Sequence, residues 1–254
     1  MYNLHTHSFY CGHGSGTIAE YAKEAERLGF SVLGFSEHCP FSDNFLSSSR
    51  MPYSDMVHYE RDVRSLDCPF PVILGYEVDY FKSRHGYYEE IRERADYLIG
   101  GTHYIFRPDG TMVSVFDRNL PSSDLKLYAD STIAAMASGL FSFYAHPDVF
   151  LSSRVFGKEE KAVSMAILDA AMDLGIPLEL NGNGYLRHRG YPSVEFWTLA
   201  AERGIPAIVS SDAHRVEDLG APFEYLKSMA SEINLNLLEP AGTEPLEFRM
   251  VQVR

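Results

Sequence analysis

Apolar residues along the chain follow two alternating patterns. Short, nearly unbroken apolar runs predict buried strands. Each run is followed by a stretch in which apolar positions recur every three or four residues, as on one face of a helix. The predicted strands cover residues 3–7, 31–38, 71–80, 97–104, 141–148, 176–184 and 205–214, and the predicted helices cover residues 18–28, 54–67, 85–95, 124–138, 161–174, 194–203 and 224–234.

This strict alternation predicts an α/β fold with a parallel sheet covered by helices. Seven such units can close into a barrel or lie open as a doubly wound sheet. Residues 40–52 and 106–123 are expected to form long loops, which in compact domains are often functional. No linker, repeat or low-complexity tract divides the 254 residues, so we expect one domain spanning residues 1–254.

Side chains that can bind metals lie at the carboxyl ends of the predicted strands. They are His5 and His7, Glu37 and His38, Glu77, His103, His146, Asn181, and Asp212 and His214. In a parallel βα barrel these strand ends meet on one face, where active sites are built. Burying so many imidazoles without a shared partner would be costly. The pattern therefore predicts a metal site on this face.

Spacing along the strands supports a site with more than one ion. His5 and His7 are two residues apart, so on a strand both side chains point the same way, and Asp212 and His214 repeat that spacing. His13 follows in the loop after the first strand. Imidazoles combined with carboxylates suit Zn, Mn or Fe, whereas Ca would need more oxygen ligands. The ligands are too many for one ion, so two or three divalent ions are expected.

The composition of the chain limits which partners and which cellular location are expected. The formal net charge is −13 and no cluster of Lys or Arg is present, which disfavours nucleic acid and anionic membranes as partners. Cys11, Cys39 and Cys68 are too few and too scattered for a disulfide framework, which predicts a reducing compartment. No leader-like segment opens the chain, and no apolar run reaches the roughly 18 residues of a membrane span. We therefore expect a cytoplasmic protein.

Six segments in order, "HTHSFYCGH", "SEHCP", "GYEVDY", "GGTHY", "AHPD" and "SSDAH", resemble the successive motifs of the polymerase and histidinol phosphatase (PHP) superfamily. The resemblance covers nearly the whole chain and keeps the motifs in sequence. It implies a PHP metallophosphoesterase domain, folded as a distorted (β/α)7 TIM-like barrel with a trinuclear metal site.

The resemblance also implies how the ligands divide among the ions. His5 and His7 would bind one ion together with Glu77 and Asp212. Glu77 would bridge to a second ion held by His103 and His146. The third ion would be held by His13, His38 and His214.

Such a centre suits phosphomonoester hydrolysis. Clustered cations attract a phosphate dianion despite the overall negative charge of the protein. They also make hydroxide available near neutral pH. We expect a metal-bridging hydroxide to attack phosphorus in line, with Asp212, Glu77 and His214 as the catalytic residues. The general acid for the leaving group stays open between a metal-bound water and Asp212.

Within the superfamily the chain most resembles the stand-alone histidinol-phosphate phosphatases, which implies hydrolysis of L-histidinol phosphate in histidine biosynthesis. Arg187 and Arg154 are the candidate ligands of the phosphate group, and Glu179 and Asp43 are candidate contacts of the substrate amine. One alternative is another small phosphoester, such as a nucleotide or sugar phosphate. A second is a metal-binding module without catalysis. The oligomeric state stays open.

Overall fold

Nine strands form the main sheet, and a two-stranded ribbon lies apart from it. The computed structural model describes residues 1–117 and 120–251. The order of the main sheet is β1-β2-β3-β4-β7-β8-β9-β10-β11, parallel from β1 to β10, with β11 antiparallel to β10. The strands are β1 (Tyr2–Asn3), β2 (Val32–His38), β3 (Val72–Asp79), β4 (Tyr97–Gly101), β7 (Phe143–Tyr144), β8 (Leu178–Asn181), β9 (Ala207–Ser210), β10 (Leu237–Thr243) and β11 (Leu246–Val251), with β5 (Tyr104–Phe106) and β6 (Met112–Ser114) in the ribbon.

The first seven strands in this order form the (β/α)7 barrel, which is distorted where it closes. No regular ladder joins β1 to β9 among the described residues. Instead the His7 N–H donates to the Ala213 carbonyl oxygen at 2.9 Å, and a parallel bridge pairs Thr6 with Ala213. The Asn3 side chain accepts the Ser211 N–H at 2.8 Å. The carboxyl ends of the first and last barrel strands are therefore fastened together, and the predicted metal-binding residues follow directly.

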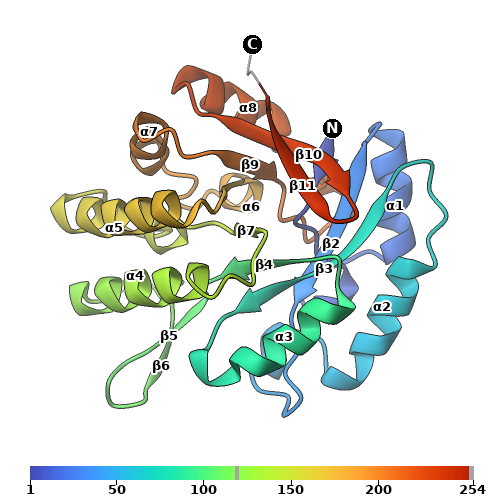
Figure 1. The fold of residues 1–254 in the computed structure, drawn as a ribbon, viewed down its shortest axis with the longest axis horizontal. Coiled ribbons are helices and arrows are strands. Elements are labelled where there is room, and N and C mark those ends of the chain that lie inside the picture. The colour runs from blue at the N-terminus through green and yellow to red at the C-terminus, as the bar shows by residue number, and fades with distance from the viewer. Residues whose placement is uncertain (118–119, 252–254) are drawn as a thin grey trace.

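Helices surround the barrel, and each long predicted helix is present within a few residues of its expected bounds (Figure 1). They are α1 (Ile18–Arg27), α2 (Met56–Arg64), α3 (His85–Arg94), α4 (Ser122–Met136), α5 (Lys158–Leu174), α7 (Val194–Glu202) and α8 (Phe223–Glu232). A short helix, α6 (Gly182–Leu186), replaces the end of the strand predicted over residues 176–184. The strand stops because the Asn181 side chain accepts the N–H groups of Asn183 and Gly184 and so caps the helix.

The start of α1 is fixed by a capping box that limits the loop carrying His13. The Thr17 hydroxyl accepts the Glu20 N–H at 3.2 Å, and the Glu20 carboxylate accepts the Thr17 N–H at 2.7 Å. Ile18 and Tyr21 then face the core. The loop is therefore held between β1 and a rigid helix end.

The two predicted long loops have different outcomes. Residues 40–52 contain only a 3-10 turn (Ser47–Ser49), in agreement with the prediction. The prediction of a loop over residues 106–123 is partly wrong, because β5 and β6 form an antiparallel ribbon there. Gly110, with φ +85°, makes the turn between these strands. Residues 118–119 of this stretch lie outside the described residues.

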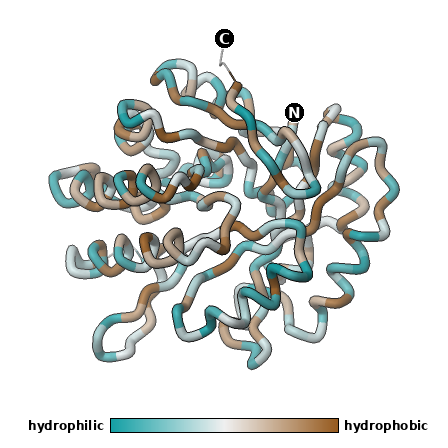
Figure 2. Tube along the Cα trace, viewed as in Figure 1, coloured by the Kyte–Doolittle hydropathy of each residue, from teal (hydrophilic) through white to brown (hydrophobic). Residues whose placement is uncertain are grey.

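A hairpin that the apolar pattern did not predict closes the amino-terminal end of the barrel. Its strands β10 and β11 bring Leu246 and Phe248 against the barrel interior, where Phe248 lies 6.4 Å from Phe143 between ring centroids. Hydrophobic colour is concentrated along the central strands in Figure 2. The interior core consists of Leu4, Val32, Ile73, Tyr97, Ile99, Phe143, Ala145, Ile208 and Leu238. One end of the barrel is thus packed, and the other is left for polar side chains.

Among the described residues, every helix is too short or too polar to cross a lipid bilayer.

Candidate active site

Nine predicted ligands converge at the carboxyl end of the barrel. Each lies at a strand end or in the loop that follows, so their approach results from the parallel sheet. They are His5, His7 and His13 after β1, His38 at the end of β2, Glu77 within β3, His103 after β4, His146 after β7, and Asp212 and His214 after β9. Seven of them are buried, His214 is half-buried, and His13 is exposed.

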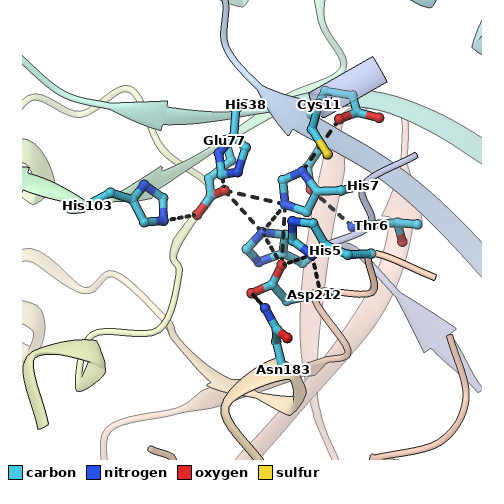
Figure 3. Close-up of polar contacts among 12 residues, drawn as sticks. His5, Thr6, His7, Cys11, His38, Glu77, His103, Asn183 and Asp212 are labelled. Carbon is cyan, nitrogen blue, oxygen red and sulfur yellow. Dashed lines mark hydrogen bonds and ion pairs between the residues drawn. The ribbon is translucent and has the colours of Figure 1, made fainter. Parts of the chain in front are cut away.

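Glu77 lies at the centre of this cluster, between histidines from separate strands (Figure 3). Its Oε1 is 2.8 Å from His146 Nε2 and 3.3 Å from His103 Nε2. Its Oε2 is 2.9 Å from His38 Nδ1 and 3.4 Å from His7 Nε2. One carboxylate therefore joins two groups of imidazoles, as the bridging role implied by the PHP resemblance requires.

A second carboxylate, Asp212, lies on the other side of His5 and His7. Its Oδ1 is 3.5 Å from His5 Nε2 and 3.3 Å from His7 Nε2, and these two nitrogens are 3.0 Å apart. Asp212 has φ +50° and His146 has φ +29°, so both ligands have left-handed backbone. Such strain persists only where surrounding contacts impose it, and it is concentrated at functional sites.

The histidines nearest the opening, His13, His38 and His214, do not form one separate group, although the PHP resemblance implies that they hold one ion together. His13 Nε2 and His214 Nε2 are 3.1 Å apart, but His38 and His214 share their group with His7. The Cys11 thiol lies within 4.8 Å of the His13 and His214 donor nitrogens. Assignment of His13, His38 and His214 to a single third ion therefore stays a prediction.

The chemistry of the cluster fits divalent cations. Ring nitrogens face one another at 3.0 to 3.2 Å in the pairs His5–His7 and His103–His146, and two facing nitrogens can share only one proton. Gly101 faces Glu77, His103 and His146 so closely that an added Cβ would lie 2.8 Å from Glu77 Oε1. The site therefore brings together nitrogen and oxygen lone pairs, and the absence of a side chain at Gly101 leaves space beside them. Cations between the nitrogens and carboxylates would satisfy both features.

Charges inside the cluster perturb its ionisation strongly. Burial disfavours the charged form of His5, but Glu179, Asp212 and Glu77 outweigh it and raise its pKa to about 10. Burial and the charge of His7 lower the pKa of His214 to about 3. Although burial opposes it, the neighbouring histidines hold the pKa values of Glu77 and Asp212 well below their usual range. Both carboxylates are therefore ionised and act as acceptors or ligands.

Three further carboxylates lie behind the histidines. Glu37 was named among the strand-end side chains but not as a ligand of a particular ion, and Glu179 and Asp79 were not predicted as part of the metal site. Glu179 Oε1 is 2.7 Å from His5 Nδ1, Asp79 Oδ2 is 3.2 Å from His103 Nδ1, and Glu37 Oε2 is 3.6 Å from His7 Nδ1. Carboxylates in this position orient metal-binding imidazoles. The sequence signal was available, because a carboxylate inside an apolar strand must find a buried partner.

The predicted contacts to the substrate amine lie away from the cavity. Glu179 is fully buried behind His5. Asp43 pairs with Arg84 at 2.8 Å. Neither carboxylate faces the space above the cluster.

A cavity of about 900 Å³ opens above the cluster, and arginines line it. Arg187, Arg189 and Arg215 lie at this opening, and the sequence pattern singled out only the first of them. The Arg187 guanidinium donates to Asp218 at 2.7 Å. The Arg189 guanidinium lies 5.0 Å from the centre of the Phe116 ring. Cationic side chains thus surround the entrance in a protein of net charge −13.

Arg154, the second predicted phosphate ligand, lies outside the cavity lining. Its guanidinium donates to Glu160 at 2.8 Å and to the Leu120 carbonyl oxygen at 2.7 Å. Glu160 also accepts the Gly157 N–H at the start of α5. These contacts give Arg154 a structural role in joining the α5 end to the preceding loop.

Known proteins similar to this chain come from one family. The family model described as "PHP domain" matches residues 3–183, and the model described as "PHP-associated" matches residues 196–222. A Deinococcus radiodurans protein named "Probable histidinol-phosphatase" is 29% identical over 233 residues, which cover 86% of this chain and 88% of the relative. The Bacillus subtilis "Histidinol-phosphatase" is 23% identical over 256 residues, which cover 87% of this chain and 96% of the relative.

A solved structure shows the same fold. Histidinol phosphate phosphatase from Lactococcus lactis, in complex with Zn, L-histidinol and phosphate, superposes with a TM-score of 0.72. The two chains are 12% identical, and the match covers 97% of this chain and 98% of the other.

Proposed function

The chain belongs to the PHP domain family, and from that premise we propose that it hydrolyses L-histidinol phosphate to L-histidinol and phosphate with the help of divalent metal ions. The observation that carries the proposal is the cluster of seven imidazoles and two carboxylates, Glu77 and Asp212, at the base of an arginine-lined cavity. The names of the Deinococcus and Bacillus relatives support this substrate.

The nine ligands would hold two to three ions of Zn, Mn or Fe, with Glu77 between the groups. Such ions, when bound, supply positive charge to a phosphate and make water more acidic. We assign Glu77, Asp212 and His214 to the catalytic centre. The neighbouring histidines hold the pKa of Asp212 well below its usual range, so its carboxylate can accept a proton.

Arg187 is the chain's own candidate for binding the phosphate. Its planar guanidinium can form two parallel hydrogen bonds to phosphate oxygens, and Asp218 already orients it at the cavity. Phe116 offers an apolar ring at the same opening, 6.0 Å from the His103 ring between centroids. An imidazole-bearing alcohol would find an aromatic surface there.

Replacing Arg187 with Ala is expected to lower kcat/KM by about 10- to 150-fold, because hydrogen bonds to a charged group contribute about 1.5 to 3 kcal/mol. Steady-state phosphate release measures this. Arg154→Ala is the matched control, since Arg154 lies outside the cavity lining, and its kcat/KM should equal that of the unmodified enzyme. Equal losses in both variants would contradict the assignment of Arg187.

The substrate is tested by a phosphate-release assay on protein loaded separately with Zn, Mn or Fe. Histidinol phosphate should exceed a panel of nucleotide and sugar phosphates by orders of magnitude in kcat/KM. A preference for another phosphoester would support phosphatase activity but exclude histidinol phosphate as the substrate. Inactivity towards the whole panel, with ions bound, would favour a non-catalytic metal-binding module. The cytoplasmic location, the absence of nucleic-acid partners and the single domain over residues 1–254 stay predictions.

A further inference from the structure

Glu179 is a fully buried carboxylate within β8 that contacts more than one part of the cluster. Its Oε1 is 2.7 Å from His5 Nδ1. Its Oε2 accepts the His146 backbone N–H at 3.0 Å and the Asn181 side-chain N–H at 2.8 Å. One side chain thus touches two predicted metal ligands from different strands.

The first contact fixes the tautomer of His5. Glu179 already accepts two N–H groups through Oε2, and its 2.7 Å contact with His5 fits a proton on His5 Nδ1 that Oε1 accepts. In the neutral imidazole the lone pair then lies on Nε2, which points toward Glu77 at 3.4 Å and Asp212 at 3.5 Å. Glu179 therefore presents the correct nitrogen of His5 to an ion.

The second contact holds a strained backbone. His146 has φ +29°, a conformation that for a residue other than glycine costs about 1 to 3 kcal/mol. The hydrogen bond from its N–H to Glu179 helps to impose this conformation, which brings His146 Nε2 to 2.8 Å from Glu77. Asn181 extends the arrangement, because its amide nitrogen also lies 3.1 Å from Asp212 Oδ2.

We propose that Glu179 is a positioning residue that fixes His5 and His146 together and so supports the binding of two metal ions. The inference rests on the metal centre of the proposed function. Glu37 provides a contrast, since it is equally buried but faces only one predicted ligand, His7. Loss of a group behind a metal ligand typically weakens metal affinity about 10- to 100-fold.

The test is a Zn titration of metal-free protein against a chromophoric chelator, together with elemental analysis of the zinc retained. Glu179→Ala should weaken two ions by about 10- to 100-fold each, and the matched Glu37→Ala should weaken one. Glu179→Gln should weaken at least one ion, because its single NH₂ must face either His5 Nδ1 or the His146 N–H. When it faces Nδ1, the proton of His5 moves to the nitrogen that would bind the ion.

Thermal unfolding of the metal-free variants separates positioning from folding. If Glu179→Ala fails to fold, the zinc affinities of Glu179→Gln, which keeps the side-chain volume, test the proposal. Unchanged zinc affinities in Glu179→Gln, or loss of a single ion in Glu179→Ala, would overturn the proposal. An unmodified chain that binds no zinc would overturn it together with the metal centre. An unmodified chain that binds zinc but does not hydrolyse histidinol phosphate would overturn only the proposed substrate.

Discussion

Glu77→Gln should lower kcat/KM by at least about 10³-fold. Glu77 shares its two oxygens among histidines of two groups, with His146 at 2.8 Å and His38 at 2.9 Å. The substitution removes a buried negative charge and directs an NH₂ donor at nitrogens whose lone pairs are needed. Loss of several kcal/mol of cation-assisted stabilisation corresponds to about three powers of ten in rate. Phosphate release and elemental analysis on the same sample measure both effects.

The control for this experiment is Glu90→Gln, the same chemical change on the exposed face of α3. It should leave kcat/KM and metal content unchanged. A Glu77→Gln enzyme that kept a full complement of ions and more than a tenth of its activity would show that Glu77 does not bridge the centre.

Tyr97→Ala is expected to reduce the free energy of unfolding by about 3 to 5 kcal/mol, as for other large aromatic residues truncated in a core. Tyr97 lies inside the barrel on β4, and its ring packs where Gly34 and Gly75 leave space beside it. Its hydroxyl oxygen is 2.7 Å from the Leu4 carbonyl oxygen and 3.1 Å from that of Phe35. The ring therefore joins three strands. Urea denaturation measures the loss.

Two companions test the source of this stability. Tyr97→Phe keeps the ring and removes only the hydroxyl, so it should lose about 1 kcal/mol. Val155→Ala, at a side chain that is 90% exposed, should stay within about 0.5 kcal/mol of the unmodified protein. A Tyr97→Ala loss no larger than that of Tyr97→Phe would mean that the ring contributes little to the barrel.

The barrel could be predicted because its strands are buried on both faces and therefore read as continuous apolar runs, as in β2 and β3. The strands outside the barrel, which are short or have one face toward solvent, lack such a continuous apolar run and were not predicted. The hairpin β10–β11 has one face toward solvent, and Glu247 and Arg249 interrupt its apolar residues. The ribbon β5–β6 is only three residues long on each side, too short for periodicity to register.

The inner part of the site was predictable for a related reason, since parallel strands bring their carboxyl ends together. The local sequence could not tell which polar residues face the cavity and which support from behind. Glu179 and Glu37 both lie within buried strands, and both lie behind imidazoles. Arg187 and Arg154 both follow strand ends, and only Arg187 reaches the cavity, because Arg154 is held by Glu160.

The closure of the barrel also sets the order of events during biosynthesis. His13 Nε2 and His214 Nε2 are 3.1 Å apart, although 201 residues separate them in the chain. At translation rates of roughly 5 to 20 residues per second, about 10 to 40 seconds pass between the synthesis of these two histidines. A nascent chain thus carries its first ligands long before their partners exist, so the complete centre can acquire its metals only late in translation or after it.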